Sequence, residues 1–297
     1  MEGMSENQNP LISSQGFEYG VKHFYAPISD KLTEILFASL QISPSEGLEL
    51  LKLGAVYVDN KRCTTDIVVN SSQLCRVHTK PRRYSADYDW KSLVVYDCAD
   101  FVVINKPSGI PSHPSVDNII ENSLTQLSGV LKCNLLITHR LDTLTSGLIV
   151  YAKNHDFVKS FNVQLQNKMI DKKYAALVET TAALPESVIH YMEPSPRAPK
   201  KVSPHFQENW AFCELKILKQ TKFDNHSHLK IDLLTGRTHQ IRSQLSELKA
   251  PIIGDTMYGS TRTYSDNAIA LRACEIEFNW LKQRLKFNLP ENFDNFI

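Results

Sequence analysis

The sequence predicts an α+β protein of two domains, a small one followed by a larger one with a mixed, mainly antiparallel sheet. In the first part of the chain, two helical patterns precede several short strand-like runs. In the longer second part, strand-like runs outnumber helical patterns and do not alternate with them regularly, which argues against a doubly wound parallel sheet. With 297 residues, the chain is long enough for one or two domains that each bury a core.

The overall composition is that of an ordinary globular protein. Hydrophobic residues make up 42% of the chain, and 33 Lys and Arg are balanced by 32 Asp and Glu. Disordered chains have fewer apolar and more charged residues. The near-neutral charge argues against purely electrostatic nucleic-acid binding, but it leaves room for a local basic groove, because the distribution of charge decides the local field.

Residues 1–18 are predicted to form a flexible tail, since Asn, Gln, Ser and Pro occur there without periodicity. This stretch has neither the regions of a signal peptide nor the Arg-rich face of a transit peptide. No run of about 18 apolar residues predicts a membrane-spanning helix. The six cysteines are scattered without a C-x-x-C pair, which favours reduced thiols and a cytoplasmic location over a disulfide scaffold or a zinc ribbon.

Residues 19–83 are predicted to form the small domain. Apolar residues at helical spacing predict a first helix over 31–40. Ser43 caps a second helix with Glu46 completing a capping box, and this helix ends at a left-handed Gly54. After it the pattern changes to alternation, with strand-like runs at 55–58, from 61 onward, at 68–69 and at 75–78, and a tight turn at Asp59-Asn60.

Residues 84–91, which are charged and aromatic, are predicted to link this domain to a larger one over residues 92–297. Strands of the larger domain are predicted at 93–96, 101–104, 148–151 and 174–178, and helices at 122–131, 156–166 and 240–248.

Three segments of the larger domain combine glycine, charge and turn-forming residues beside apolar strands. The first, residues 105–114, is rich in proline and carries Lys106. The second, residues 139–148, brings an imidazole, a guanidinium and a carboxylate within four positions. The third, residues 234–242, places two arginines and an amide at a helix start, which suits phosphate or carboxylate contact. Taken alone, each segment also fits a polar turn or a solvated helix start.

Together these segments resemble, in order and spacing, the RluA-type pseudouridine synthases. The H-R-L-D-x-x-T-S-G stretch from His139 to Gly147 is unusually specific, and the resemblance extends over the whole second domain. The matching blocks are Ile104–Gly109, His139–Gly147, Lys173–Val178, Thr235–Arg242, Pro251–Asp255 and Met257–Gly259.

The resemblance implies an isomerase that converts uridine in RNA to pseudouridine. The N1–C1′ bond breaks, uracil turns in the pocket, and C5 bonds to C1′; neither a cofactor nor a metal is implied. Asp142 is implied as the catalytic carboxylate, acting through attack at C1′, addition at C6 or a glycal intermediate. A guanidinium partner opposes the rise in carboxylate pKa that burial causes, and Arg242 matches that partner, with Arg237 as the second choice.

Other residues take their roles from the same resemblance. Tyr174 matches the tyrosine that packs on the target base and can assist proton transfer at C5. Arg140 matches the residue that fills the stack when the base is flipped out, a step that costs a few kcal/mol. The motif residues predicted to bind RNA or the substrate are Arg140, His139, Lys106, Arg237 and Thr145. Two departures bear on RNA contacts: Ser243-Gln244 replaces the usual Val-His, and Arg272 stands where histidine is common.

The small domain resembles the alpha-L RNA-binding module, with the 54–59 hairpin as the best match. Residues 19–83 hold nine Lys and Arg against six Asp and Glu, a net charge of +3. Because the basic residues gather at Lys61-Arg62 and 76–83, the strands and linker are predicted to contact RNA. Ribosomal RNA is the favoured substrate and tRNA the other option; no membrane or obligatory protein partner is expected. The competing hypothesis is a catalytically silent RNA-binding or chaperone protein that retains the fold.

Overall fold

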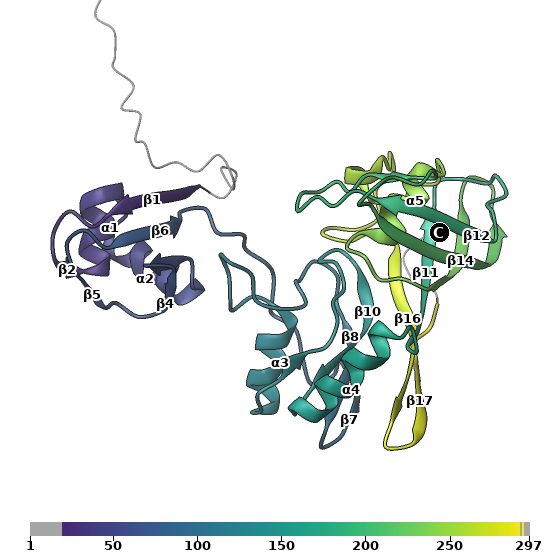
Figure 1. The fold of residues 1–297 in the computed structure, drawn as a ribbon, viewed down its shortest axis with the longest axis horizontal. Helices are drawn as coiled ribbons and strands as arrows, with labels where there is room; N and C mark the ends of the chain where they lie inside the picture. Colours follow the sequence, from purple (N-terminus) through teal and green to yellow (C-terminus); the bar gives the residue numbers. More distant parts are fainter. Residues whose placement is uncertain (1–19, 292, 294–297) are drawn as a thin grey trace, which may run out of the picture. The chain divides into compact units, whose positions relative to one another are not determined.

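The computed structural model describes residues 20–291 and 293, which form two compact units (Figure 1). The first unit takes in the described residues up to Ser85 together with His113–Thr125. The second takes in Ala86–Ser112 and the chain from Gln126 onward. The predicted tail at 1–18 lies outside the described residues.

The first unit has two helices and two small antiparallel sheets. Strands β1, β6, β3 and β4 form one sheet in that order, and β2 pairs with β5 in the other. The elements are β1 (Val21–Tyr25), β2 (Asp30–Lys31), α1 (Leu32–Leu40), α2 (Pro44–Leu53), β3 (Val56–Val58), β4 (Lys61–Cys63), β5 (Val68–Val69) and β6 (Leu74–His78).

Local sequence signals account for most of this unit. The Ser43 side chain and the Glu46 side chain form the predicted capping box at the start of α2, and Gly54 ends the helix at φ 70°. Asp59 and Asn60 both have positive φ, as a tight turn between β3 and β4 requires. Strand β1 was not predicted, because its apolar and polar residues do not alternate cleanly.

Residues 113–125 depart from the predicted division, which assigned them to a continuous domain over 92–297. They pack with the first unit because their polar groups find partners there. Asp117 is fully buried and accepts hydrogen bonds from Arg82 Nε (3.0 Å), Arg82 Nη2 (2.6 Å) and the Arg82 backbone N–H (2.9 Å). Glu121 pairs with Arg83, and the Tyr57 hydroxyl donates to the Val116 carbonyl.

The second unit is built on one large sheet. Its strands follow the order β13-β12-β14-β15-β11-β16-β10-β8-β7, with β17 added to β16 and β9 to β10. Every pairing is antiparallel except that of β10 with β16, so the predicted mixed, mainly antiparallel α+β class is confirmed. The strands are β7 (Val94–Asp97), β8 (Phe101–Lys106), β9 (Leu136–Ile137), β10 (Ser146–Ala152), β11 (Asp171–Val178), β12 (Ser187–Met192), β13 (Val202–Ser203), β14 (Ala211–Lys222), β15 (Ser227–Leu233), β16 (Leu271–Trp280) and β17 (Gln283–Asn288).

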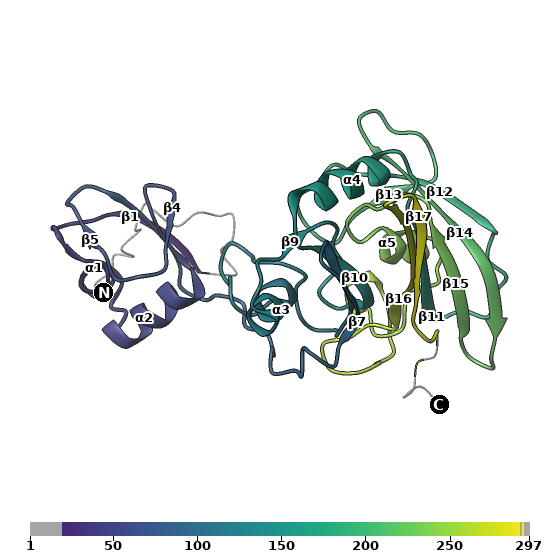
Figure 2. The same ribbon diagram turned by 90° about the horizontal axis from the view of Figure 1, so that it is seen from below.

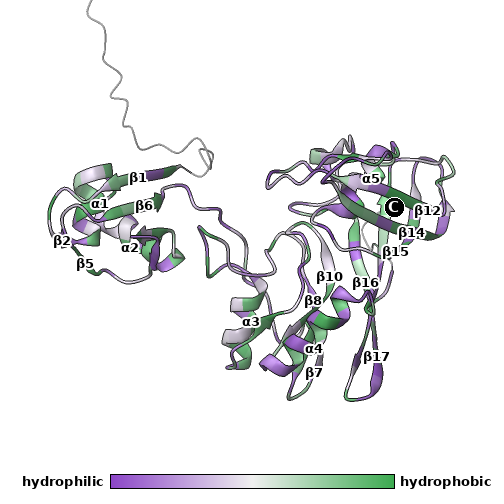
Figure 3. Ribbon diagram, in the orientation of Figure 1, coloured by the Kyte–Doolittle hydropathy of each residue, from purple (hydrophilic) through white to green (hydrophobic). Residues whose placement is uncertain are grey.

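Three α-helices and a short 3-10 helix accompany these strands. They are α3 (Ser123–Leu131), which contains the boundary between the units, α4 (His155–Gln166), α5 (Gln240–Glu247) and η2 (Thr256–Tyr258). Hydrophilic and hydrophobic residues alternate along α4 (Figure 3), whose Phe157 and Phe161 enter a core with Phe101 and Phe278. Helix α5 lies against the sheet (Figure 2). Its Gln244 Nε2 donates to the Val188 carbonyl of β12 and to the Cys213 carbonyl of β14.

Two further features concern the whole described chain. All six cysteines are free thiols, as their spacing predicted. In the part of the chain that the structure describes, no helix is both long and apolar enough to span a bilayer.

Candidate functional site

The turn that carries Asp142 is fixed on both sides by hydrogen bonds. The Ser112 hydroxyl accepts from the Leu141 backbone N–H at 3.0 Å and donates to its carbonyl at 2.9 Å. The Thr145 N–H donates to the Asp142 carbonyl at 3.1 Å and closes the turn. The Asp142 side chain is 21% exposed, so its carboxylate is held at the surface of a rigid turn where a ligand can reach it.

Glycine is required where this turn enters β10. Gly147 has φ 112°, and a Cβ atom at this position would lie 2.2 Å from the Ala273 carbonyl oxygen. Gly147 and Ala273 come this close because they are partners in the parallel pairing of β10 with β16. The small residue therefore allows the only parallel strand pair of the described sheet to form beside Asp142.

Lys106 lies beneath the turn and is fully buried. Its Nζ donates to the carbonyls of Pro107 and Ile110, each at 2.8 Å, and to that of Thr143 at 3.4 Å. Burial lowers the pKa of Lys106 to about 7, and the nearby charge of Asp142 opposes this shift. The Lys106 amino group is thus enclosed by the carbonyls of two loops and ties them together, and its contact with RNA or the substrate stays a prediction.

Arg242 on α5 is shared between two carboxylates. Its Nε and Nη2 donate to Asp255 at 2.7 and 2.9 Å, and both side chains are almost fully buried. Its Nη1 lies 3.4 Å from Oδ2 of Asp142. Burial lowers the pKa of Arg242, but the two carboxylates outweigh this effect and raise it, so the guanidinium remains charged. The structure thus brings together Asp142 and Arg242, which the sequence had predicted to pair.

His239 and Tyr258 complete the surroundings of Asp142. His239 Nε2 lies 3.9 Å from Asp142 Oδ2, and His239 Nδ1 lies 3.0 Å from the Tyr258 hydroxyl. The same hydroxyl accepts the Lys200 backbone N–H at 2.7 Å. The Arg242 guanidinium also stands 4.9 Å from the centre of the Tyr258 ring.

Tyr174 is buried on β11, where it pairs in register with Ile231 and Ala273. Burial raises the pKa of Tyr174 well above its ordinary value, and the negative charge of Asp142 adds to the effect. Its hydroxyl therefore stays protonated at neutral pH, which suits a packing ring and a hydrogen-bond donor.

The other predicted site residues divide into surface and interior positions. The side chains of Arg140 and Arg237 are exposed, and Arg140 Nη2 lies 3.5 Å from the Thr238 hydroxyl. Arg237 has no described contact with Asp142, so Arg242 alone holds that position in the described residues. Thr145 is buried, and its hydroxyl has no partner among the described residues.

His139 makes its described contacts within the fold, and its predicted binding to RNA or the substrate stays a prediction. Its Nε2 accepts the Val150 backbone N–H at 3.2 Å, and its ring stacks on Phe161 at 5.7 Å. Burial lowers the pKa of His139 to about 3, so the imidazole is neutral and can accept this bond. His139 thus anchors the Asp142 turn to β10 and α4.

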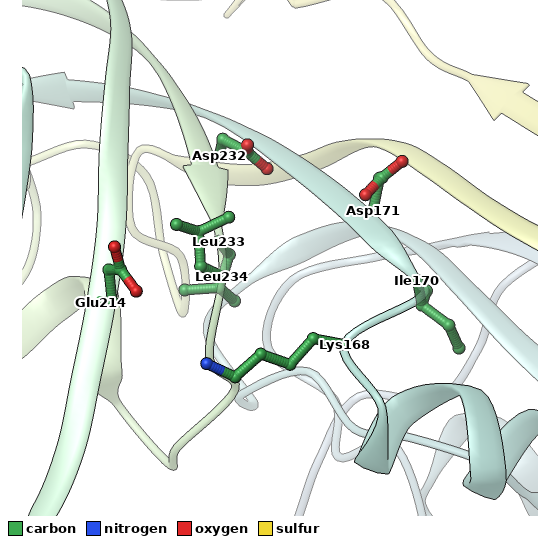
Figure 4. Close-up of a pocket in the computed structure, with 7 residues that line it drawn as sticks. All are labelled: Lys168, Ile170, Asp171, Glu214, Asp232, Leu233 and Leu234. Atoms are coloured by element: carbon green, nitrogen blue, oxygen red, sulfur yellow. The ribbon is translucent and has the colours of Figure 1, made fainter.

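A small cavity of about 120 Å³ lies elsewhere in the second unit (Figure 4). Three carboxylates and one ammonium group line it with apolar side chains, and none of the predicted site residues is among them. The lining residues are Lys168, Ile170, Asp171, Glu214, Asp232, Leu233 and Leu234. Burial raises the pKa of Asp232, and Asp171 adds to the rise. The excess of acidic groups makes this cavity a poor site for RNA phosphates.

Sequence reasoning had assigned no role to Asp255, His239 or Tyr258. Asp255 and Tyr258 lie in the two last matching blocks, and His239 lies in the block that contains Arg242. The signal was therefore present as motif membership, but only the folded chain shows that these side chains surround Asp142.

The family model that matches this chain and the proteins to which it is similar all carry the name pseudouridine or pseudouridylate synthase. The family model described as RNA pseudouridylate synthase matches residues 100–247, which include Asp142, Tyr174 and Arg242. "RNA pseudouridine synthase 6, chloroplastic" of Oryza sativa subsp. japonica is 35% identical over 62% of this chain, and the match covers only 43% of that protein.

Two bacterial relatives match over more of their length. An "Uncharacterized RNA pseudouridine synthase" of Helicobacter pylori is 31% identical, with 91% of this chain and 89% of the relative covered. "Ribosomal large subunit pseudouridine synthase D" of Neisseria meningitidis is 28% identical over 82% of this chain and 67% of the relative. Among solved structures, "Human RNA Pseudouridylate Synthase Domain Containing 1" shares the fold with a TM-score of 0.54, at 24% identity over 66% of this chain and 82% of that one.

Proposed function

This chain belongs to the RNA pseudouridine synthase family, and we propose that it isomerises uridine in RNA to pseudouridine with Asp142 as the catalytic carboxylate. The observation that carries the proposal is the 3.4 Å contact between the partly exposed Asp142 and the buried, charged Arg242. An ionised carboxylate in a site that excludes water needs such a cation, because desolvation alone favours its protonated form.

The neighbouring side chains suit the proposed chemistry. Asp255 occupies two nitrogens of Arg242, so the third is directed at Asp142 and orients its carboxylate. Tyr174 supplies a buried ring against which a base can pack, with a hydroxyl that is protonated at neutral pH. The exposed Arg140, beside the Asp142 turn, is suited to fill the space of a flipped base.

The test is release of tritium from RNA labelled at C5 of uridine, because C5 must lose its hydrogen when it bonds to C1′. RNA from cells that lack this gene serves as the substrate. Release by the purified protein, with pseudouridine appearing at one or a few positions on mapping, is the expected result. A protein that binds this RNA without releasing tritium would instead support the silent RNA-binding hypothesis.

Ribosomal RNA is the substrate class that we favour over tRNA. The support is the similarity to a relative named as a ribosomal large subunit enzyme, together with a separate unit ahead of the Asp142 unit. The same labelled RNA, separated by size before the assay, distinguishes the two classes. Tritium release from the small-RNA fraction alone would point to tRNA.

We also propose that the first unit binds RNA through its strands. Arg82 and Arg83 are already paired with Asp117 and Glu121, whereas Lys61, Arg62 and Arg76 lie on the strands. Arg76 and Arg62 flank the Tyr57 ring at 4.0 and 5.0 Å. The buried Arg76 Nε and Arg62 Nη1 have no partner among the described residues.

The test is the salt dependence of RNA affinity. Removing one phosphate-binding cation lowers the slope of log affinity against log salt by roughly 0.7 to 0.9. R76A should therefore reduce the slope by about that amount without changing the turnover of bound RNA. An unchanged slope would assign RNA binding to the second unit instead.

A further inference from the structure

A histidine and a tyrosine with no assigned role form a second set of contacts around Asp142. The two polar contacts described for the Asp142 carboxylate, with Arg242 Nη1 at 3.4 Å and with His239 Nε2 at 3.9 Å, both involve the same oxygen, Oδ2. Within the described residues, no hydrogen bond or ion pair involves the other oxygen, Oδ1. The two side chains therefore hold the carboxylate in one rotation and leave Oδ1 for the substrate.

The tautomer of His239 depends on the direction of its hydrogen bond with the Tyr258 hydroxyl. The Tyr258 hydroxyl accepts the Lys200 backbone N–H at 2.7 Å and lies 3.0 Å from His239 Nδ1. When it donates its own proton to Nδ1, the neutral imidazole carries its hydrogen on Nε2, the nitrogen that faces Asp142. Burial lowers the pKa of His239 and Arg242 supports this, while Asp142 opposes the shift, so the neutral form is favoured.

The backbone of His239 adopts a left-handed conformation that histidine rarely takes, which suggests that its side chain is needed at this position. It has φ 58° and ψ 20°, in the left-handed region, at the position just before α5. A residue with a Cβ atom costs roughly 1–2 kcal/mol there, and glycine or asparagine would suit the position better. Its side chain makes no capping hydrogen bond to the helix. Histidine at this position therefore needs an explanation other than the start of the helix.

We propose that His239, held by Tyr258, is a positioning residue for Asp142, donating from Nε2 to Oδ2 so that Oδ1 faces the substrate. The 3.9 Å between Nε2 and Oδ2 is longer than a hydrogen bond, so this role requires the two atoms to approach each other when the substrate binds. Because Lys200 donates its N–H to Tyr258, the basic loop around residues 197–201 is connected to Asp142 through these two side chains. This inference rests on the proposed isomerase function.

Two substitutions separate this role from a purely structural one. In H239Q the side-chain amide can reach the place of Nε2 and donate to Asp142. In H239N the shorter amide reaches only the place of Nδ1, so it no longer touches Asp142, while its interaction with Tyr258 can remain. If His239 served only to begin α5, H239N would be the milder change, since asparagine is well suited to left-handed and N-cap positions. A positioning role reverses this order.

The measurement is the single-turnover rate of tritium release at saturating RNA, with RNA affinity and melting temperature measured on the same full-length proteins. We expect H239N to lower the rate about 10- to 100-fold with unchanged RNA affinity, and H239Q to lower it only about fivefold. A rate for H239N equal to or above that of H239Q overturns the inference. A wild-type protein that releases no tritium rejects the proposed function itself, which is a distinguishable result.

A double-mutant cycle tests the part played by Tyr258. Y258F removes the hydroxyl and keeps the ring beside Arg242, so it should slow the reaction in the wild-type background but add little in H239N. Equal effects in both backgrounds would show that Tyr258 acts independently of His239, and would overturn the proposed pairing.

Discussion

The two units each contain an arginine that grips an aspartate with two nitrogens, and the two pairs differ in what the arginine does next. In the first unit Arg82 donates to Asp117 through Nε at 3.0 Å and Nη2 at 2.6 Å. In the second unit Arg242 donates to Asp255 through the same two nitrogens, at 2.7 and 2.9 Å. Both aspartates are almost fully buried, so both carboxylates are removed from water.

The two arginine–aspartate pairs differ in the contacts that they make beyond these two hydrogen bonds. Asp117 also accepts the Arg82 backbone N–H and the Ser115 hydroxyl, whereas the Arg82 side chain is 38% exposed. Arg242 is 3% exposed, and its remaining Nη1 is aimed at a second carboxylate, Asp142. The Arg82–Asp117 pair therefore fixes the segment 113–125. The Arg242–Asp255 pair instead holds the Arg242 guanidinium beside the partly exposed Asp142. The same geometry is structural in one place and preparatory for chemistry in the other.

The largest expected effect is that of replacing Asp142, whose partly exposed carboxylate has a single contact with Arg242. D142N should lower turnover at least about a thousandfold, because an amide can neither act as nucleophile nor stabilise a positive centre. The fold should survive, since the side-chain volume is unchanged and Arg242 keeps its bonds to Asp255. Tritium release, RNA affinity and melting temperature on the same preparation check this. Normal turnover would refute the assignment of Asp142.

The second largest effect is expected at Asp255, whose carboxylate accepts two hydrogen bonds from Arg242. D255N leaves a buried guanidinium without its main counter-charge, which costs about 3–5 kcal/mol of stability. It should also lower turnover, because Arg242 is then free to move toward Asp142. All three tryptophans, Trp90, Trp210 and Trp280, belong to the second unit, so denaturant unfolding followed by their fluorescence measures this destabilisation directly. A midpoint equal to that of the wild type would show that Asp255 does not stabilise the buried arginine.

The equivalent change in the first unit should have a smaller effect and a different readout. D117N should cost about 1–3 kcal/mol, because Arg82 can recover water through its exposed part. Tryptophan fluorescence should not report it, whereas proteolysis within residues 113–125 should become faster. D97N, which breaks the surface pair with Lys153, is the matched control and should cost at most about 1 kcal/mol. Equal protease sensitivity of D117N and D97N would contradict the role given to Asp117.

The sequence predicted best what depends on neighbours along the chain. The capping box at Ser43 and Glu46 and the left-handed Gly54 need only a few adjacent residues, and these features appear in the structure where they were predicted. Strands β12 to β17 were not predicted individually; β15 and β17 carry polar or charged residues on one face, and a bulge shifts the register between β14 and β15. Patterns of alternation lose their clarity where one face of a strand is ionised and a bulge shifts the register.

The sequence predicted which motif residues belong to the site, but not which of their side chains are buried. The resemblance singled out Asp142 and Arg242, which lie 100 positions apart and are 3.4 Å apart in the structure. Lys106 and His139 were assigned to RNA or substrate contact because polar motif residues were assumed to face the ligand, yet their polar atoms bond to backbone groups. Burial is a property of the folded chain, so neither residue type nor spacing could distinguish the two cases. The docking of 113–125 on the first unit was missed for the same reason.

The smallest expected effect concerns how the Arg82–Asp117 pair responds to acid. Burial alone would raise the pKa of Asp117, but the Arg82 side chain, the Arg82 backbone N–H and the Ser115 hydroxyl outweigh it and hold the pKa well below its usual range. A depressed native pKa contributes stability that is fully present above the unfolded value, about 3.9, and is lost as the pH falls below it. Because D117N carries no titrating group there, the stability difference between wild type and D117N should be constant above about pH 5 and shrink by about 1 kcal/mol toward pH 3. Circular dichroism of the full-length proteins during denaturant unfolding at each pH measures this difference, and a difference that grows in acid would mean that Asp117 is protonated in the native state.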